Sequence, residues 1–413
     1  MINSDIIIIG GGAAGLVAAC AAGASAERTN KKINISIIEK NSRVGKKLLG
    51  TGNGRCNLSN VNVGSKFFHG PLPELIENIL NRRPLGETLS FFNDIGLHVA
   101  EEEGRLYPKS GTASSVLDAL RFEAERLNVK TIASEDVSEI IRDKKIFTVK
   151  TAGGGEFFSH AVVVATGGKA APFTGSDGSG IFLLSHLGHS ITAPYPALTP
   201  LIVKHPSLAS LKGIRISGCR VALFSKKNEI AADSGEIIFN EAGISGIPAL
   251  NISGAAHGNG NLSALVDLAP ELDSEEVKKI LARRLARYSE RPAELFFTGW
   301  FHKRVGQALL REAGCDSVNN KSLERLASVI KRWTFPVTGV KGFSSAQATG
   351  GGVSLAEFSC ENLESKKIPG LFATGEVLDV YGDCGGYNLH WAWTTGFLAG
   401  EGAAAYAAGR GNE

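Results

Sequence analysis

Short runs of apolar residues recur along the chain, and each run ends at a glycine or a small polar residue. Residues 5–9 ("DIIII") predict a buried strand, and the alanine-rich stretch from Ala13 to roughly Ala24 predicts a helix directly after it. Residues 33–39 ("INISIIE") predict the next strand and complete a strand–helix–strand unit. Residues 160–166 ("HAVVVAT") and 371–374 predict further strands of the same apolar kind, so both ends of the chain contribute to one fold.

The middle of the chain has a different pattern. From about residue 192 to residue 272, short β-like runs are separated by glycine, proline and serine, which predicts a separate β-rich domain. Asp273 and Glu276 then have capping-box spacing ahead of helically spaced apolar residues, which predicts a helical insertion. The expected architecture is α/β and discontinuous: residues 1–191 and 346–413 form one domain, residues 192–272 and 334–345 a β-rich insert, and residues 273–333 a helical insert.

Composition adds three constraints. With 413 residues and 43% hydrophobic content, the chain can bury at least one large core. Glycine accounts for 50 residues, above its usual share of about 7%, and the glycines cluster where apolar runs end, so the backbone must turn sharply or approach a ligand there. The net charge is +3 and no long basic run occurs, so a nucleic-acid partner is not expected.

The six cysteines are scattered, without a C-x-x-C pair or a histidine at metal-ligand spacing, so neither a disulfide framework nor a metal site is expected. The apolar stretch after Met1 is short, carries Asp5 and is not typical of a signal peptide. Residues 390–408 are apolar but carry Glu401, which favours a buried helix over a membrane span. We therefore expect a cytoplasmic protein without a membrane partner.

The first glycine cluster has a definite mechanical interpretation. In "GGGAAG", Gly10, Gly12 and Gly15 match G-x-G-x-x-G between a predicted strand and a predicted helix. Gly10 allows the tight turn, Gly12 the close approach of a diphosphate, and Gly15 the packing of helix against strand. Glu39 ends the second strand, where a carboxylate can accept hydrogen bonds from ribose hydroxyls. This motif alone leaves NAD and FAD open.

Seven motifs spread over nearly the whole chain resemble those of the bacterial BaiN/YhiN-like flavoprotein family, also called aminoacetone-oxidase-like. They are "GGGAAG" (10–15), "EKNSRVGKKLLGTGNGRCNLSN" (39–60), "GRLYPKSGTASSVLDAL" (104–120), "ATGG" (165–168), "TGSDGSG" (174–180), "GVSLAEF" (352–358) and "ATGEVLDVYGDCGGYNLHWAWTTG" (373–396). The resemblance implies a Rossmann-like FAD-binding domain of the two-dinucleotide-fold flavoprotein type, with a β-barrel-like insert and a small helical domain.

The resemblance also implies noncovalent FAD and assigns its contacts. Val137 would contact the adenine, Gly375 and Glu376 the pyrophosphate and ribityl chain, and the helix beginning at Asn388 and Leu389 the pyrimidine end of the flavin. The complete expected set is Gly10, Gly12, Ala13, Ala14, Gly15, Glu39, Lys40, Arg43, Lys47, Gly54, Arg55, Asn57, Val137, Ala165, Thr166, Gly167, Gly375, Glu376, Gly386, Asn388 and Leu389.

Two groups within this set remain open to more than one interpretation. Arg43, Lys46 and Lys47 can neutralise phosphate charge or form a solvated basic face. The loop "TGNGRCN" (51–57) is glycine-rich, and Arg55 within it offers a planar cationic group to a phosphate, a flavin oxygen or a substrate carboxylate. For Arg55 we favour the functional interpretation.

Catalytic groups are harder to assign, because in flavin chemistry the protein mainly supplies position and electrostatics. Arg55, Tyr107, Tyr387 and His390 are weak candidates, since Tyr and His can donate or accept a proton. For Tyr107 and His390, each taken singly, we favour ordinary packing with a satisfied hydrogen bond. Cys56 and Cys384 both fall in loops expected near the flavin, but without a close pair we favour small buried cysteines over a dithiol mechanism.

Three function classes follow. The first is an FAD-dependent oxidoreductase that acts on a small organic substrate; the resemblance implies amine oxidation or enone-type reduction. The second is an FAD-dependent RNA-modifying enzyme, for which Lys278, Lys279, Arg283, Arg284 and Arg287 form a modest basic cluster, although Glu275 and Glu276 beside it favour a solvated helix face. The third is a non-catalytic flavin-binding redox protein. No second dinucleotide motif occurs, so we expect NADH or NADPH to bind only transiently, as an electron donor.

Overall fold

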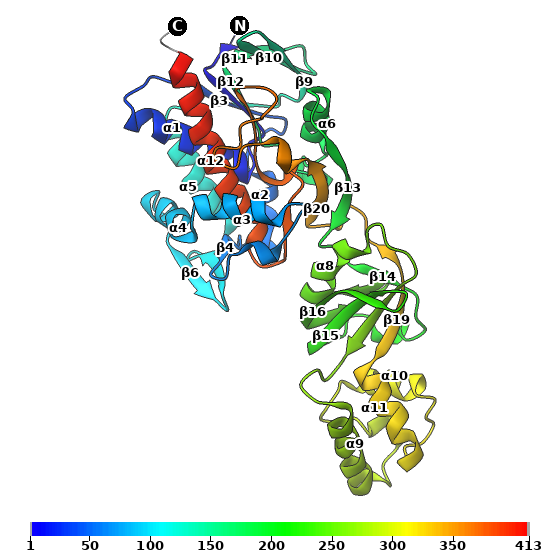
Figure 1. The fold of residues 1–413 in the computed structure, drawn as a ribbon. Helices are drawn as coiled ribbons and strands as arrows, with labels where there is room; N and C mark the ends of the chain where they lie inside the picture. The colour runs from blue at the N-terminus through cyan, green and yellow to red at the C-terminus, as the bar shows by residue number, and fades with distance from the viewer. Residues whose placement is uncertain (1, 411–413) are drawn as a thin grey trace. The chain divides into compact units, whose positions relative to one another are not determined.

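A computed structural model describes residues 2–410 and divides the chain into two compact units. The first unit comprises Met1–Pro196 and Gln347–Glu413, and the second comprises Ala197–Ala346 (Figure 1). The first unit is therefore assembled from both ends of the chain, as the strand pattern predicts. The helical segment expected as a third part belongs to the same compact unit as the β-rich segment.

A parallel five-stranded sheet forms the centre of the first unit. Four of its strands are buried at every position, which explains why they appear in the sequence as uninterrupted apolar runs, whereas the edge strand Lys130–Ala133 is partly exposed. In spatial order they are β21 (Leu371–Ala373), β12 (Ala161–Val164), β2 (Ile6–Ile9), β3 (Ile35–Glu39) and β8 (Lys130–Ala133). The predicted strands and the discontinuous Rossmann-like α/β fold are thus confirmed. The strand ends differ from the predicted ones by one or two residues.

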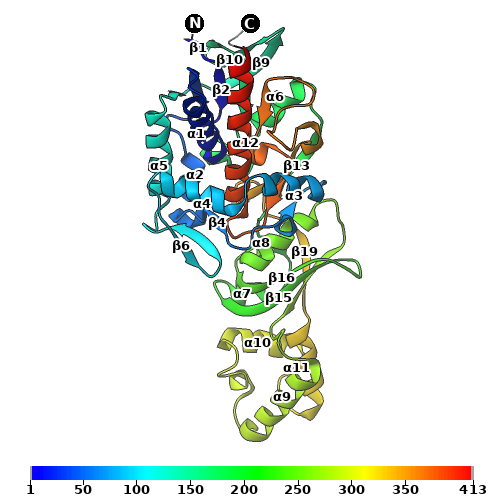
Figure 2. The ribbon, with the colours of Figure 1, turned by 60° about the vertical axis from the view of Figure 1, so that its left-hand side comes forward.

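Helices α1 (Ala13–Arg28) and α12 (Tyr387–Arg410) pack side by side on this sheet (Figure 2). Their backbones are close: a Cβ atom on Gly396 would lie 2.7 Å from the Ala14 carbonyl oxygen, and one on Gly400 would lie 2.2 Å from that of Ala18. Since residue 396 lies over residue 14 and residue 400 over residue 18, the two helices are parallel. The N-terminal end of α12 therefore extends about eight residues, roughly 12 Å, past the N-terminal end of α1.

Smaller elements complete the first unit. An antiparallel ribbon of β9 (Val137–Asp143), β10 (Ile146–Thr151) and β11 (Glu156–Ser159) is extended by β1 (Ile2–Asn3). The remaining helices are α2 (Lys46–Gly50), α3 (Pro73–Arg82), α4 (Leu85–Asp94), α5 (Ala113–Arg126) and α6 (Ser179–His186). The remaining strands are β4 (Ser59–Asn60), β5 (Phe68–His69), β6 (Val99–Glu102), β7 (Arg105–Pro108), β13 (Ile191–Ala197), β20 (Ala348–Val353) and β22 (Tyr381–Gly382).

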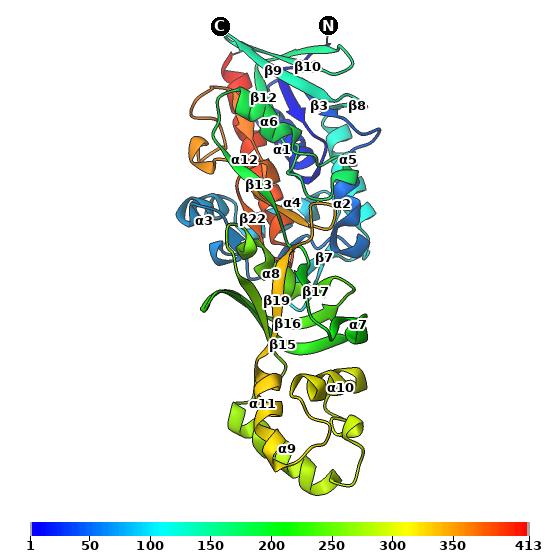
Figure 3. The same ribbon diagram turned by 90° about the vertical axis from the view of Figure 1, so that its right-hand side faces the viewer.

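The second unit contains a closed six-stranded barrel and three main helices (Figure 3). Around the barrel the strands are β14 (Leu201–Val203), β17 (Gly243–Ser245), β16 (Asn228–Phe239), β15 (Arg215–Ser225), β18 (Leu262–Asp267) and β19 (Trp333–Val340). Short helices α7 (Leu208–Leu211) and α8 (Ile247–Ser253) accompany it. The other helices are α9 (Ser274–Tyr288), α10 (Lys303–Glu312) and α11 (Leu323–Lys331).

Two expectations about helices are settled. Asp273 caps α9 by accepting a hydrogen bond from the Glu276 amide, and the Glu276 carboxylate accepts one from the Asp273 amide, so the capping box is confirmed.

Residues 390–408 lie within α12, where Glu401 forms an ion pair with Arg28 at 3.0 Å. Among residues 2–410, every helix is too short or too polar to cross a membrane.

Candidate functional site

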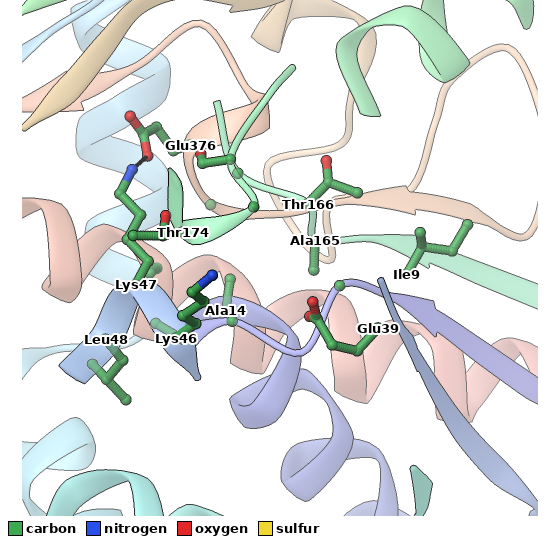
Figure 4. Close-up of a pocket in the computed structure, with 18 of the residues that line it drawn as sticks. Ile9, Ala14, Glu39, Lys46, Lys47, Leu48, Ala165, Thr166, Thr174 and Glu376 are labelled. Carbon is green, nitrogen blue, oxygen red and sulfur yellow. Dashed lines mark hydrogen bonds and ion pairs between the residues drawn. The ribbon is translucent and has the colours of Figure 1, made fainter. Parts of the chain in front are cut away.

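An elongated cavity lies in the first unit, where the strands of the parallel sheet end (Figure 4). The residues that follow β2, β3, β12 and β21 all line it, as expected for a ligand site at the carboxyl ends of parallel strands. Its volume is about 1240 Å³ when the part open to solvent is included. Fifteen of the expected cofactor residues border it: Gly10, Gly12, Ala13, Ala14, Glu39, Lys40, Lys47, Val137, Ala165, Thr166, Gly167, Gly375, Glu376, Asn388 and Leu389.

The glycines before α1 shape one wall of this cavity. Gly10 has φ of +100°, and a Cβ atom there would lie 2.6 Å from the Ala165 carbonyl oxygen. A Cβ atom on Gly15 would lie 1.9 Å from the Gly10 carbonyl oxygen, so this glycine allows the turn to pack on the helix. A Cβ atom on Gly12 would meet no atom within 4 Å, because it would point into open space. The start of α1 has no side-chain cap, so its amides can donate to a diphosphate.

Glu39 is held in place at the end of β3. Its Oε2 accepts a hydrogen bond from the Gly11 amide at 2.8 Å, and its Oε1 accepts two from Asn41, from the amide at 2.8 Å and from Nδ2 at 2.7 Å. A carboxylate oxygen has two lone pairs, so Oε2 retains the capacity to accept one more hydrogen bond. The side chain is therefore fixed in an orientation that suits a ribose hydroxyl.

Three lysines border the cavity, Lys40, Lys46 and Lys47, and two of them pair with carboxylates. Lys47 lies 2.6 Å from Glu376 Oε2, and the other Glu376 oxygen accepts a hydrogen bond from the Thr349 amide at 2.6 Å (Figure 4). Lys40 lies 2.6 Å from Asp177. Burial alone would raise the pKa of Asp177, but hydrogen bonds from Lys40 and Ser179 lower it overall.

The start of α12 forms the far end of the cavity. Asn388 donates to the Gly382 carbonyl at 2.7 Å and accepts from the Gly382 amide at 2.9 Å, which fixes the preceding loop. Thr395, two turns further along the helix, accepts a hydrogen bond from the Gly375 amide at 2.9 Å. The positive end of the α12 dipole therefore faces the cavity, where it would stabilise negative charge.

This donor set fits FAD. The uncapped start of α1 suits the diphosphate, Glu39 suits the ribose, Val137 and Asn388 also border the cavity, and the space beside Gly12 would be filled by any side chain there. When bound, FAD would supply two-electron chemistry at its ring.

Six expected cofactor residues do not border the cavity: Gly15, Arg43, Gly54, Arg55, Asn57 and Gly386. The expectation for Arg55 needs the largest correction. Its guanidinium lies 2.5 Å from Glu102 on the surface and 4.2 Å from the centre of the Tyr107 ring, since "TGNGRCN" folds outward as a short 3₁₀ turn. Arg43 is exposed. Gly386 is required for packing, because a Cβ atom there would lie 2.4 Å from the Ser59 carbonyl oxygen.

The remaining catalytic candidates also lie outside the cavity lining. Tyr387 is buried and stacks on Phe67 with ring centres 4.5 Å apart, and burial raises the pKa of its phenol to about 12. His390 is 1% exposed, and its Nδ1 lies 3.0 Å from Ser59 Oγ. Burial lowers the pKa of His390 to about 4. Tyr107 packs under Arg55. The packing interpretation thus accounts for these three residues.

The two cysteines near the site differ from each other. Cys56 is completely buried, and desolvation raises the pKa of its thiol to about 12, so it cannot act as a thiolate nucleophile. Cys384 is partly exposed, and its Sγ lies 3.9 Å from Oε1 of Gln347, a residue of the cavity lining. The structure therefore favours a buried packing role for Cys56.

Sequence reasoning missed several polar residues of the lining: Asn41, Thr51, Glu135, Asp136, Thr174, Ser176, Ser179 and Gln347. The "TGSDGSG" turn carries a usable signal, because Gly175 and Gly178 both have positive φ, and the Thr174 carbonyl accepts from Asn41 Nδ2 at 3.1 Å. Gln347 has no such signal, since the sequence does not show that the strand after the second unit borders the cavity.

Comparison with known proteins agrees with this site. The family model described as HI0933-like protein Rossmann domain matches residues 4–402, and the chain belongs to this family. The chain is 38% identical over 408 residues to a 3-dehydro-bile acid delta(4,6)-reductase of Clostridium scindens, covering 96% of this chain and 98% of that protein. It is 27% identical over 413 residues to a ribosomal RNA dihydrouridine synthase of Haemophilus influenzae, covering 95% and 97%.

Among solved structures, 3-ketosteroid delta1-dehydrogenase from Sterolibacterium denitrificans matches with a TM-score of 0.54 at 14% identity, covering 98% of this chain and 100% of that chain. This likeness concerns the fold. Family membership and the reductase relative identify the protein as an FAD-dependent oxidoreductase.

Substitutions at two glycines of the first turn should have separate effects, one on FAD binding and the other on the stability of the fold. Gly12→Val should give a folded protein whose FAD affinity falls by at least about tenfold, or about 1.4 kcal/mol, because the new side chain occupies the cavity. Gly15→Ala should lower the free energy of unfolding by about 1–3 kcal/mol, because its Cβ meets backbone. Flavin absorbance per protein and thermal unfolding measure the two effects.

Gly64→Val is the matched control, since a Cβ atom at Gly64 also meets nothing within 4 Å but Gly64 lies outside the cavity lining. It should keep its flavin. Wild-type flavin content in Gly12→Val would contradict the assignment of the diphosphate to this turn.

The lowered pKa of the buried His390 should make the stability of the protein depend on pH. The folded protein keeps the imidazole neutral down to about pH 4, whereas the unfolded chain binds a proton near the ordinary pKa of 6.5. The unfolded state therefore binds more protons within this window, so stability is complete above pH 6.5 and falls as the pH is lowered. At pH 5 the loss is about 2 kcal/mol.

Hydrogen exchange of the α12 amides at pH 7 and pH 5 reports this change in the first unit. In the His390→Gln variant, the decrease in the free energy of unfolding between pH 7 and pH 5 should be smaller by about 2 kcal/mol. His186→Gln, which alters an exposed histidine of α6, should leave it intact. An equal loss in wild type and His390→Gln would show that other groups cause it.

Proposed function

We propose that the protein is an FAD-dependent reductase that saturates a carbon–carbon double bond conjugated to a carbonyl group. The supporting observation comes from two relatives that each match at least 95% of the chain. Their names give different substrates, but both names describe the saturation of a carbon–carbon double bond. The double bonds of a 3-oxo bile acid with 4,6 unsaturation are conjugated to the C3 carbonyl. The 5,6 double bond of uridine is conjugated to its C4 carbonyl. Amine oxidation, the other expected activity, lacks such support.

The chemistry of such a bond defines what the protein must provide. The carbonyl makes the β-carbon electrophilic, so a hydride adds there and a proton adds to the α-carbon. Reduced FAD, held noncovalently, would supply the hydride. The protein would bind its diphosphate at the start of α1 and its ribose at Glu39, and would stabilise charge with the start of α12. The substrate gains two electrons, and NADH or NADPH, binding transiently, would restore the reduced cofactor.

For the proton we propose Tyr195, which, like the earlier candidates, does not itself border the cavity but lies beside two segments that do. The Tyr195 ring lies against β20, since a Cβ atom on Gly350 would be 2.2 Å from it, and Gln347 just before this strand borders the cavity. Tyr195 forms a hydrogen bond with the buried Tyr381, next to Val380 of the cavity lining. Burial raises the pKa of Tyr195, so the phenol keeps its proton at neutral pH.

Two substrate classes fit this reaction. A bile-acid-type 3-oxo steroid is the first, because the relative with 38% identity is named for it. Uridine in RNA is the second, because the relative with 27% identity over 413 residues is named for dihydrouridine synthesis in ribosomal RNA.

The reaction class can be tested with photoreduced holoenzyme under anaerobic conditions. Mixing with a steroid 4,6-dien-3-one or with uridine-containing RNA should reoxidise the flavin, and the product of at least one should gain two hydrogens by mass spectrometry. The saturated steroid and RNA with dihydrouridine in place of uridine are the matched controls and should not react. Failure of both unsaturated compounds, or reduction of the oxidised flavin by primary amines instead, would refute the proposal.

Tyr195→Phe tests the proton source. It should slow substrate reduction by about 100-fold or more, as for loss of a general acid, and leave reduction of the flavin by NADPH unchanged. A solvent deuterium isotope effect on substrate reduction should also disappear. Tyr107→Phe, which alters a tyrosine outside the cavity lining, is the control. Wild-type rates in Tyr195→Phe would exclude it as the acid.

A further inference from the structure

One side of α9 carries a row of cations without acidic partners. Lys279, Arg283 and Arg287 are spaced by four residues, so they lie on the same face of the helix, and all three are exposed. No ion pair involves them among residues 2–410. We call these three residues the α9 row.

The other cations of the same helix are already engaged. Lys278 lies 2.8 Å from Glu275 and 2.5 Å from Glu324. Arg284 donates hydrogen bonds to the carbonyl oxygens of Phe296 and Thr298 at 2.6–3.0 Å. The helix thus has one side whose cations stabilise the fold and one side whose cations do not.

The acidic residues beside the basic cluster do not neutralise the α9 row. Glu276 is occupied by the capping box with Asp273, and Glu275 pairs with Lys278. The sequence places these two carboxylates beside the basic cluster, which favours a solvated helix face. In the structure both carboxylates are committed at the first turn of α9.

More positive charge and several aromatic rings lie next to the α9 row. Beyond Arg283 and Arg287 of the row and the engaged Arg284, residues 288–311 include four basic and two acidic residues. Arg284 ties the end of α9 to the loop that leads to α10, so these residues form one continuous region (Figure 3). In this region Tyr288 is 38% exposed, and Trp300 stacks on Phe301 with ring centres 4.8 Å apart.

We propose that the α9 row, with the exposed Tyr288 ring beside it, is a docking surface for an RNA strand. Uncompensated cations on one surface repel each other, and a polyanion relieves this repulsion and releases its own counterions. Exposed aromatic rings stack on unpaired bases. This inference rests on the proposed function and selects its second substrate class. The surface would bind phosphates without regard to base sequence, and the reacting uridine would be selected at the flavin.

Charge removal tests the surface in the intact holoenzyme. The probe is a fluorescently labelled, single-stranded, uridine-containing RNA, titrated at several salt concentrations. The triple variant Lys279→Gln/Arg283→Gln/Arg287→Gln should bind it at least about tenfold more weakly at low salt. The slope of log affinity against log salt should become shallower by about 2, since each phosphate contact on a single strand contributes about 0.7.

The matched control removes the same charge elsewhere. Lys31→Gln/Lys32→Gln/Lys227→Gln alters three exposed lysines for which no ion pair is seen among the described residues, and it should bind RNA as the wild type does. Circular dichroism verifies that both variants fold. Equal affinity and equal salt slope in the α9 triple variant and the wild type would overturn the proposal.

A parallel assay separates this inference from the proposed function. Reoxidation of the reduced flavin by the small steroid dienone does not involve the α9 row, so its rate in the triple variant should equal that of the wild type. RNA binding that depends on the row, without reduction of any conjugated double bond, would support the surface and refute the reductase. Reduction of the dienone without RNA binding that depends on the row would support the reductase and refute the RNA-binding surface.

Discussion

The close parallel contact between α1 and α12 determines the geometry of the cofactor site. Gly396 and Gly400 bring α12 so near to α1 that any side chain at these positions would strike the Ala14 or Ala18 carbonyl. Because the two helices are parallel but offset by about 12 Å, their positive ends lie at different heights along one cavity. A long cofactor can thus meet one helix end at its phosphates and another at its ring. The two halves of the fold, which come from opposite ends of the chain, are joined by this contact.

Much of this arrangement can be predicted from the sequence, because its causes are local. Buried parallel strands must be apolar at successive positions, and the turn before α1 requires glycine where φ is positive or where a Cβ would collide. The capping box of Asp273 and Glu276 is likewise a local pattern with a local consequence. Most of the predicted cofactor residues that border the cavity follow strands or begin helices, where the chain path is fixed by these patterns, whereas Glu39 ends β3 and Val137 begins β9.

The predictions that failed depend on contacts distant in sequence. A glycine-rich loop with an arginine indicates a flexible turn, but the sequence does not reveal that Glu102 lies opposite and holds Arg55 at the surface. Similarly, the sequence shows Glu275 and Glu276 beside a basic cluster, whereas only the structure shows which cation each one binds. Gln347 enters the cavity lining because a chain segment returns there after a separate 150-residue unit.

The strands that lead into and out of the second unit are hydrogen-bonded neighbours. Gly350 packs on Tyr195 and Gly351 on Ala193, so β13 and β20 run in opposite directions and residue 197 lies opposite residue 348. The second unit has its own core, and its two ends are therefore adjacent. A short turn could therefore join β13 directly to β20 as a simple hairpin, so the chain path of the first unit does not require the second unit between them.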